Sequence, residues 1–326
     1  MEPKALPFES LFSTLRAADY YWSPLSPERW MRQREQARAN PASFDPWVRC
    51  FGLGLEVPEG EFNAADLNNF TIKNNRSHET LLTSIWGVSR TDDVFIAHSH
   101  SRSHSRSHSH SHSMIHGAYI GQETATLIEC MKRHRTAFQG QNVLDLGCGA
   151  GALSLSIASQ ARSVLGLDCS NSATHLAQAS ACAQGFHHLD FQPLAIGSAA
   201  AEKVVSARGP WHAAVMNPPM AIPEFSSRPE RDGGHFGIEL PLQFLDFARR
   251  HLVKGAPIFM LATNPVTRKS REGLFFEALR ERSSAWSLDD STSLDRRFNH
   301  SLARKHRYAE QGIERIELWY LKLIKI

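Results

Sequence analysis

Short apolar segments alternate with helix-compatible segments from about residue 114 onward. Parallel strands need crossover connections, which are usually helices, so this alternation predicts an α/β fold with a doubly wound, mostly parallel sheet. The final segment (314–326) alternates in a way that suits a terminal strand paired antiparallel with its predecessor. We interpret five earlier segments as strands: QNVLDLG (141–147), SVLGLDC (163–169), HHLDFQP (187–193), HAAVMNP (212–218) and PIFMLATN (257–264).

The chain is long enough for about two domains. Residues 8–22 and 26–39 carry apolar residues at roughly helical spacing, and shorter apolar stretches at 81–88 and 92–98 suit strands. No catalytic signature occurs there. We therefore expect a smaller, helix-rich accessory domain at 1–97 that recognises the substrate, and a second domain at 114–326.

Between these domains, serine alternates with histidine or arginine at residues 98–113. Histidine is a common metal ligand and arginine pairs with phosphate, so the tract is compatible with metal or RNA binding. We favour a solvated, disordered insertion, because a metal site needs ligands held in fixed geometry and this composition cannot bury a core.

Composition excludes several other classes. The formal net charge of +3 permits an acidic partner such as RNA without arguing for one. The five cysteines include no Cys-x-x-Cys pair, so we expect no disulfide framework and no metal site. We see no signal peptide and no membrane-spanning segment, and we expect a soluble, cytoplasmic protein with no membrane partner. The sequence does not indicate an oligomeric state.

A glycine-rich loop follows the first predicted strand of the second domain. It reads Asp145-Leu146-Gly147-Cys148-Gly149-Ala150-Gly151 and opens a predicted helix. Glycines allow a tight turn and close approach to a ligand, and the free amides of a helix N-terminus bind anions. Asp168, at the end of the next strand, is placed to accept hydrogen bonds from ribose hydroxyls. With Ala152, the loop also fits the dinucleotide fingerprint, so a nicotinamide-dependent oxidoreductase is an alternative.

The fourth predicted strand ends abruptly in Asn217-Pro218-Pro219-Met220. Each proline fixes its own φ, and the residue before a proline avoids helical geometry, so Asn217 is held rigidly. The Asn217 side-chain oxygen and the Pro218 carbonyl supply two acceptors for the two N–H groups of an amide or exocyclic amine. Such a clamp aims the nitrogen lone pair and stabilises the positive charge that develops on it.

Together, these two motifs resemble those of class I S-adenosylmethionine-dependent methyltransferases. DLGCGAG (145–151) looks like their first motif, and Asn-Pro-Pro looks like the fourth motif of their amino-methylating branch. The resemblance covers residues 115–326 and implies a seven-stranded, Rossmann-like sheet with S-adenosylmethionine as cofactor. It implies catalytic roles for Asn217 and Pro218 and substrate contacts from Asn217, Pro218, Pro219 and Met220. It also implies a set of cofactor-binding residues: Asp145, Gly147, Cys148, Gly149, Gly151, Asp168 and Asn217.

This chain departs from the family pattern at two places. Residues 194–196 (Leu-Ala-Ile) stand where the family has an acid near the adenine, and Asp190 lies earlier, inside the predicted strand, so no adenine contact is assigned. Met220 stands where the family usually has an aromatic residue. Methionine covers a flat surface but does not reproduce ring stacking. Phe225 and Phe236 are candidates to replace that ring. The loss weakens the expectation of a stacked base and favours a glutamine side chain or a less usual substrate.

Two flanking segments add to the resemblance. Residues 228–252, with Asp-Gly-Gly at 232–234, resemble the segment that follows Asn-Pro-Pro in release-factor glutamine methyltransferases and, more loosely, in ribosomal RNA amino-methyltransferases. Upstream, Tyr119, Gln122 and Thr124 correspond to a segment that helps to close the cofactor site, although a structural role is favoured for each. A solvated face is the favoured interpretation of two basic sets: Arg29, Arg32, Arg34 and Arg38, and Arg304, Lys305 and Arg307.

The sequence thus predicts an enzyme that methylates an amide or amino nitrogen on RNA or on a translation-factor protein. A non-catalytic RNA- or metal-binding module on a methyltransferase-like fold is a second alternative, with residues 98–113 as its working part.

Overall fold

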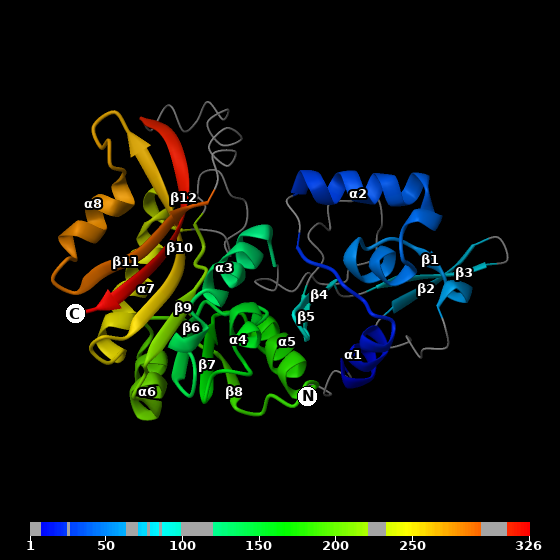
Figure 1. The fold of residues 1–326 in the computed structure, drawn as a ribbon, viewed down its shortest axis with the longest axis horizontal. Coiled ribbons are helices and arrows are strands. Elements are labelled where there is room, and N and C mark those ends of the chain that lie inside the picture. Colours follow the sequence, from blue (N-terminus) through cyan, green and yellow to red (C-terminus); the bar gives the residue numbers. More distant parts are fainter. Residues whose placement is uncertain are drawn as a thin grey trace. The chain divides into compact units, whose positions relative to one another are not determined.

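A computed structural model describes residues 8–24, 27–62, 71–76, 79–84, 87–98, 120–220, 233–294 and 312–326 (Figure 1). The chain forms two compact units, one comprising residues 1–126, 149–156 and 170–191, and the other residues 127–148, 157–169 and 192–326. The predicted boundaries at 97 and 114 stay a prediction, and residues 99–113 of the His/Ser tract lie outside the described residues. No helix of the described ranges is long and apolar enough to cross a membrane.

A seven-stranded sheet organises the second half of the chain, in the order β11-β12-β10-β9-β6-β7-β8. β6 is parallel to both β7 and β9, β9 is parallel to β10, and β12 is antiparallel to both β10 and β11. The doubly wound, mostly parallel sheet and its antiparallel last strand are therefore confirmed. The strands are β6 (Asn142–Leu146), β7 (Ser163–Asp168), β8 (Leu189–Pro193), β9 (Ala213–Met216), β10 (Pro257–Thr267), β11 (Trp286–Ser293) and β12 (Ile313–Lys325).

Strand β11 has no counterpart among the predicted strands. Its sequence, WSLDDSTS, buries its first residue and exposes most of the rest, because β11 lies at one edge of the sheet. An edge strand of this kind lacks the apolar alternation on which strand prediction depends.

Helices connect the strands, and two of them begin with serine caps. Ser170 Oγ accepts the amide of Ala173 at 3.2 Å, and Ser198 Oγ accepts that of Ala201 at 3.2 Å. Each bond satisfies one of the amides left free at a helix start. The helices are α3 (Gln122–Lys132), α4 (Ala152–Ser156), α5 (Asn171–Cys182), α6 (Ala199–Arg208), α7 (Glu239–His251) and α8 (Leu274–Glu281), with 3₁₀ turns at Arg135–Ala137 and His235–Gly237.

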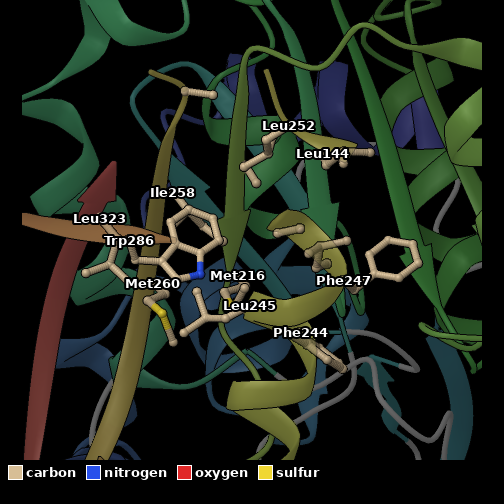
Figure 2. Packing of buried hydrophobic residues seen from close by; sticks show 14 of the residues in the cluster. Leu144, Met216, Phe244, Leu245, Phe247, Leu252, Ile258, Met260, Trp286 and Leu323 are labelled. Atoms are coloured by element: carbon tan, nitrogen blue, oxygen red, sulfur yellow. The ribbon is translucent and has the colours of Figure 1, made fainter. Parts of the chain in front are cut away.

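One face of the sheet carries a large apolar cluster, which Figure 2 shows around Met216, Met260 and Trp286. Leu144 and Leu146 of β6 belong to this cluster, as do helices α6, α7 and α8 through their buried residues. Side chains alternate between the two faces of a strand, so the buried Asp145 between these leucines points to the opposite face. The cluster fixes which residues of each strand point to which face.

The N-terminal segment contains the expected helices, α1 (Phe8–Ala17) and α2 (Pro27–Ala39). Phe8, Leu11, Phe12 and Leu15 form the buried stripe of α1, at the spacing that the sequence shows. The described residues of this segment also form five short strands: β1 (Val57–Pro58), β2 (Thr71–Arg76), β3 (Glu79–Ser84), β4 (Gly87–Thr91) and β5 (Val94–His98). Single-turn elements complete it: 3₁₀ turns at Pro41–Ser43 and Glu59–Glu61 and a π-helix at Val48–Gly52.

Within the same compact unit, the hairpin β4–β5 is attached to the end of α5 by a glutamine. Gln184 Oε1 accepts the Phe95 amide at 2.8 Å, and Gln184 Nε2 donates to the Phe95 carbonyl at 2.8 Å. The side-chain amide thus pairs with both backbone groups of Phe95, as a neighbouring strand would.

Candidate functional site

Three of the predicted site residues lie one position beyond a common row of the sheet. Leu146 is in register with both Leu167 and Met216. Gly147, Asp168 and Asn217 come next in each chain, so they end three adjacent parallel strands at the same carboxyl edge. In doubly wound sheets, ligands bind at this edge, where the strand order reverses. Here the order reverses between β6 and β9.

The glycine loop leaves β6 in a conformation that suits glycine. Gly147 has φ 74°, Gly149 has φ 52° and Gly151 has φ 77°. The amides of Gly147 and Cys148 donate to the Leu167 carbonyl at 2.8 and 3.0 Å. These bonds join the loop to β7 directly before Asp168. They also occupy the backbone amides of Gly147 and Cys148, and the helix that follows, α4, has only five residues.

Two carboxylates flank this loop. Asp145 is fully buried in β6, and its register partner in β7 is Gly166, which has no side chain. Asp168 is half-buried at the end of β7. Carboxylates are acceptor-only groups when ionised, which suits ammonium and hydroxyl donors. The two carboxylates are therefore suitable acceptors for the amino group and the ribose hydroxyls of S-adenosylmethionine.

Cys148 is a buried thiol rather than a nucleophile. Burial raises the pKa of the Cys148 thiol well above its ordinary value, and the charges of Asp145 and Asp168 raise it further. A thiol with a raised pKa stays protonated and is inert near neutral pH. Cys148 thus contributes shape and its backbone to the loop.

The Asn-Pro-Pro-Met segment follows β9 directly. Met216 and Pro218 are buried, whereas Asn217, Pro219 and Met220 are half-buried. The buried strand and the two prolines fix the backbone of Asn217, and its neighbours leave part of it accessible. Residues 221–232, including Phe225, lie outside the described residues.

A glycine from later in the chain packs against this segment. A Cβ atom built on Gly233 would lie 2.8 Å from the Pro219 carbonyl oxygen, from the Met220 Cα atom and from the Gly237 carbonyl oxygen. All three are backbone atoms, so only a residue without a side chain fits. The sequence singled out Asp-Gly-Gly by resemblance but gave no sign of this contact.

The turn that begins at Gly233 is held by its own hydrogen bonds. The Gly237 amide donates to the Gly234 carbonyl at 2.8 Å, and the Leu240 amide donates to the Gly233 carbonyl at 3.0 Å. Buried Thr263 of β10 donates its hydroxyl to the Gly237 carbonyl at 3.4 Å. Backbone and strand β10 therefore fix the position of the turn against Pro219 and Met220.

A second Asn-Pro pair, Asn264-Pro265, has a different role. Asn264 is fully buried; its Oδ1 accepts the Phe275 amide at 3.2 Å, and its Nδ2 donates to the Glu272 carbonyl at 2.8 Å and to Glu317 Oε2 at 3.1 Å. It caps the start of α8. Burial of Glu317 acts to raise its pKa, but hydrogen bonds from Trp319, Arg315 and Asn264 outweigh burial, and the net pKa lies below the ordinary value.

The other predicted residues lie on different elements. Gln122 is exposed and Thr124 is buried in the first turn of α3, Asp190 is half-buried inside β8, and Tyr119 lies outside the described residues. A Cβ on Gly151 would lie 2.9 Å from that of Ala177, so this glycine permits close packing against α5.

The four arginines of the first basic set, at 29, 32, 34 and 38, differ in their exposure and contacts. Arg29, Arg32 and Arg38 are exposed on α2, as a solvated face predicts. Arg34 instead donates to the Leu53 and Gly54 carbonyls at 3.1 and 3.3 Å and covers the Trp30 ring. The set 304–307 lies outside the described residues.

The family model of the methyltransferase small domain matches residues 113–278 of this chain. No curated protein sequence matches the chain.

Among solved structures, TrmN from Thermus thermophilus is 18% identical, with 63% of this chain and 52% of that chain aligned at a TM-score of 0.40. A ribosomal protein L11 methylase from Lactobacillus delbrueckii subsp. bulgaricus is 14% identical, with 64% and 80% aligned at a TM-score of 0.40. An rRNA methylase from Streptococcus thermophilus is 12% identical, with 63% and 95% aligned at a TM-score of 0.38. This chain spans about half the length of TrmN.

Proposed function

We propose that this chain, which belongs to the methyltransferase small domain family, uses S-adenosylmethionine to methylate an amide or exocyclic amino nitrogen. The acceptor is part of a macromolecule, either a ribosomal or transfer RNA or a protein glutamine of the translation machinery. The observation that carries the proposal is that half-buried Asn217 and buried Pro218 directly follow β9, at the same carboxyl edge of the sheet as Gly147 and Asp168.

Asp145 would hold the amino group of the cofactor, and Asp168 would hold its ribose hydroxyls. The loop of Gly147 and Cys148 would lie beside the cofactor, together with Gly149 and Gly151 of the same motif. When bound, S-adenosylmethionine supplies an electrophilic methyl group on a sulfonium. The residues of this chain contribute chiefly positioning, which is worth up to roughly 7–11 kcal/mol when the reacting atoms are held near attack geometry.

Asn217 and Pro218 make the acceptor nitrogen reactive. Their two oxygens accept its two N–H hydrogens and direct the lone pair at the methyl carbon. The accepting nitrogen would form the new N–C bond, and Asn217 and Pro218 would keep it aligned for that bond. The charge that develops on nitrogen faces the same two oxygens, which stabilise it. The nitrogen then loses one proton to solvent, so no general base is required.

Incubation with methyl-labelled S-adenosylmethionine and separate RNA and protein fractions tests the proposal. We expect label in one fraction, on a nitrogen, and none when Asn217→Ala replaces the wild type. Label on carbon or oxygen, or in neither fraction, would refute it.

Two further measurements address the alternatives. Calorimetry should detect S-adenosylhomocysteine binding and no comparable NAD binding; tight NAD binding alone would support the oxidoreductase. Deletion of residues 99–113 should leave methyl transfer unchanged; His98 is kept because it is buried at the end of β5. Loss of transfer would instead give the His/Ser tract a working role.

A further inference from the structure

One continuous segment, the turn that begins at Gly233 and helix α7 behind it, contacts both motifs of the candidate site. Gly233 lies against the backbone of Pro219 and Met220. Farther along the same segment, Phe244 of α7 lies against Gly147 of the glycine loop. The segment therefore connects the motif that would hold the acceptor to the motif that would hold the cofactor.

The contact between Phe244 and Gly147 leaves little room for a side chain at position 147. A Cβ atom built on Gly147 would lie 3.2 Å from Phe244 Cε2 and 3.8 Å from Phe244 Cζ, so the edge of the ring covers the bare α-carbon. The Gly147 amide also donates to the Leu167 carbonyl at 2.8 Å, directly before Asp168. The ring therefore supports the loop at the point where the loop is bonded to β7.

The turn that starts this segment is held in a conformation that its sequence does not favour. Half-buried Phe236 has φ 55° and ψ 13°, in the left-handed region that bulky residues rarely adopt. Such a conformation persists only where its surroundings impose it. The Leu240 amide, in the first turn of α7, donates to the Gly233 carbonyl at 3.0 Å. The turn and the helix are thus one connected piece.

Helix α7 is itself fixed on the sheet. Phe244, Leu245 and Phe247 are buried members of the core cluster, and Figure 2 shows them beside one another. Between them in the chain, Asp246 accepts hydrogen bonds from Arg282 Nε at 3.2 Å and from Arg282 Nη2 at 3.0 Å. A bidentate pair of this kind restricts orientation as well as distance. The helix is therefore held by its apolar face and by an ion pair.

We propose that Phe244 is a positioning residue for methyl transfer, and that the turn and α7 form a rigid spacer that sets the glycine loop relative to the Asn-Pro-Pro-Met segment. This inference rests on the proposed function and adds a residue that neither motif contains. The last register pair of β6 and β9 is Leu146 with Met216, so both motifs lie beyond the strand ladder and need another support. Transfer depends on the distance between the two reactants, and a misplacement of 1 Å can cost about 100-fold in rate.

The decisive variant is Phe244→Leu, which removes the ring edge and keeps an apolar side chain. A loop with less support has to be ordered when the cofactor binds, so the Kd for S-adenosylhomocysteine should rise at least about threefold. At saturating cofactor, the rate of single-turnover methyl transfer should fall roughly 10- to 100-fold. Both quantities are measured at a temperature where melting curves show that the variant is folded.

Phe247→Leu is the matched control on the same helix. Phe247 is buried in the same cluster, its ring contacts His251 with centroids 4.6 Å apart, and none of its described atoms lies within 4 Å of a Cβ built on Gly147. Both variants should lower the melting temperature similarly, since each trims one buried phenylalanine. Only Phe244→Leu should change the Kd and the transfer rate. Equal changes in the two variants, or an unchanged Kd and rate in Phe244→Leu, would overturn the proposal.

A double-mutant cycle tests the contact itself. Gly147→Ala adds a methyl group that meets the Phe244 ring, and it also strains the backbone at φ 74°. Phe244→Leu relieves the first effect and leaves the second. The double variant should therefore bind S-adenosylhomocysteine more tightly than the product of the two single losses predicts. Losses that simply multiply would show that the two residues act separately and would overturn the proposal.

These measurements separate this inference from the proposed function. Label on carbon or oxygen would overturn the proposed function, while the comparison of Phe244→Leu with Phe247→Leu would still decide the role of Phe244. Label on nitrogen with equal responses of the two variants would overturn this inference alone. A wild-type chain that does not bind S-adenosylhomocysteine would overturn both.

Discussion

Replacing Gly233 with alanine tests how the Asn-Pro-Pro segment is positioned. The added Cβ would lie 2.8 Å from three backbone atoms, and ordinary contact begins near 3.4 Å. The backbone of Pro219, Met220 or Gly237 therefore has to move by about 0.6 Å, because no flexible side chain can give way. Overpacking of this kind costs roughly 1–3 kcal/mol of unfolding free energy.

The same displacement should act on turnover more than on cofactor binding. A misplacement of 1 Å can cost about 100-fold in rate, so we expect kcat to fall roughly 10- to 100-fold. Gly147 and Asp168 lie on other strands, so the Kd for S-adenosylhomocysteine should change by less than about threefold. Single-turnover methyl transfer and calorimetry on the same preparation measure both quantities.

Gly60→Ala is the matched control, because a Cβ there meets nothing within 4 Å and the backbone is outside the left-handed region. It should leave kcat and the melting temperature unchanged. A folded Gly233→Ala protein with wild-type kcat would refute the positioning argument. Equal losses of kcat and cofactor affinity would show general disruption instead.

Four further outcomes follow from the site and its surroundings. Asn217→Ala should leave S-adenosylhomocysteine binding intact and lower turnover by about 100-fold or more; a parallel loss of binding would make Asn217 structural. Asp168→Ala should weaken cofactor binding first, and unchanged calorimetry would contradict its ribose role. Asn264→Ala removes the cap of α8 and should cost about 2–4 kcal/mol in urea unfolding; a cost under about 0.5 kcal/mol would contradict the assigned contacts. Because the pKa of Glu317 is lowered on folding, its contribution is present above the ordinary carboxyl pKa and is lost as pH falls through the folded value, so Glu317→Gln should flatten the acid side of the stability profile. An unchanged acid limb would refute this.

The sequence determined the sheet well where strands are buried on both faces. The apolar runs in β6, β7, β9 and β10 mark them without any tertiary information, and strong alternation marks β12. The polar edge strand β11 and the strands β1 and β2 of the N-terminal segment escaped prediction, because their pairing depends on neighbours rather than on their own composition. In the same segment, β5 lies within the stretch expected at 92–98, and the stretch expected at 81–88 spans the end of β3 and the start of β4. Helix α4 is shorter than its apolar sequence suggested, since turns replace helix after Ser156.

For the candidate site, local motifs indicated the residues that end the parallel strands. Gly147, Asp168 and Asn217 follow three predicted strands, and the carboxyl ends of parallel strands meet at one edge, so their common row was implicit in the sequence. Local pattern did not indicate that Leu167 occupies the Gly147 and Cys148 amides, because that bond joins residues about 20 positions apart.

Only the tertiary structure decided what surrounds Asn-Pro-Pro-Met. The contact of Gly233 with Pro219, the support of Gly237 by Thr263 and the left-handed Phe236 all depend on where later segments return to the sheet. Sequence periodicity reports which face of an element is buried, but not which distant backbone it meets. The sequence therefore determined the fold class and the ends of the strands, and the packing of the chain determined which residues hold Asn217 and its neighbours in place.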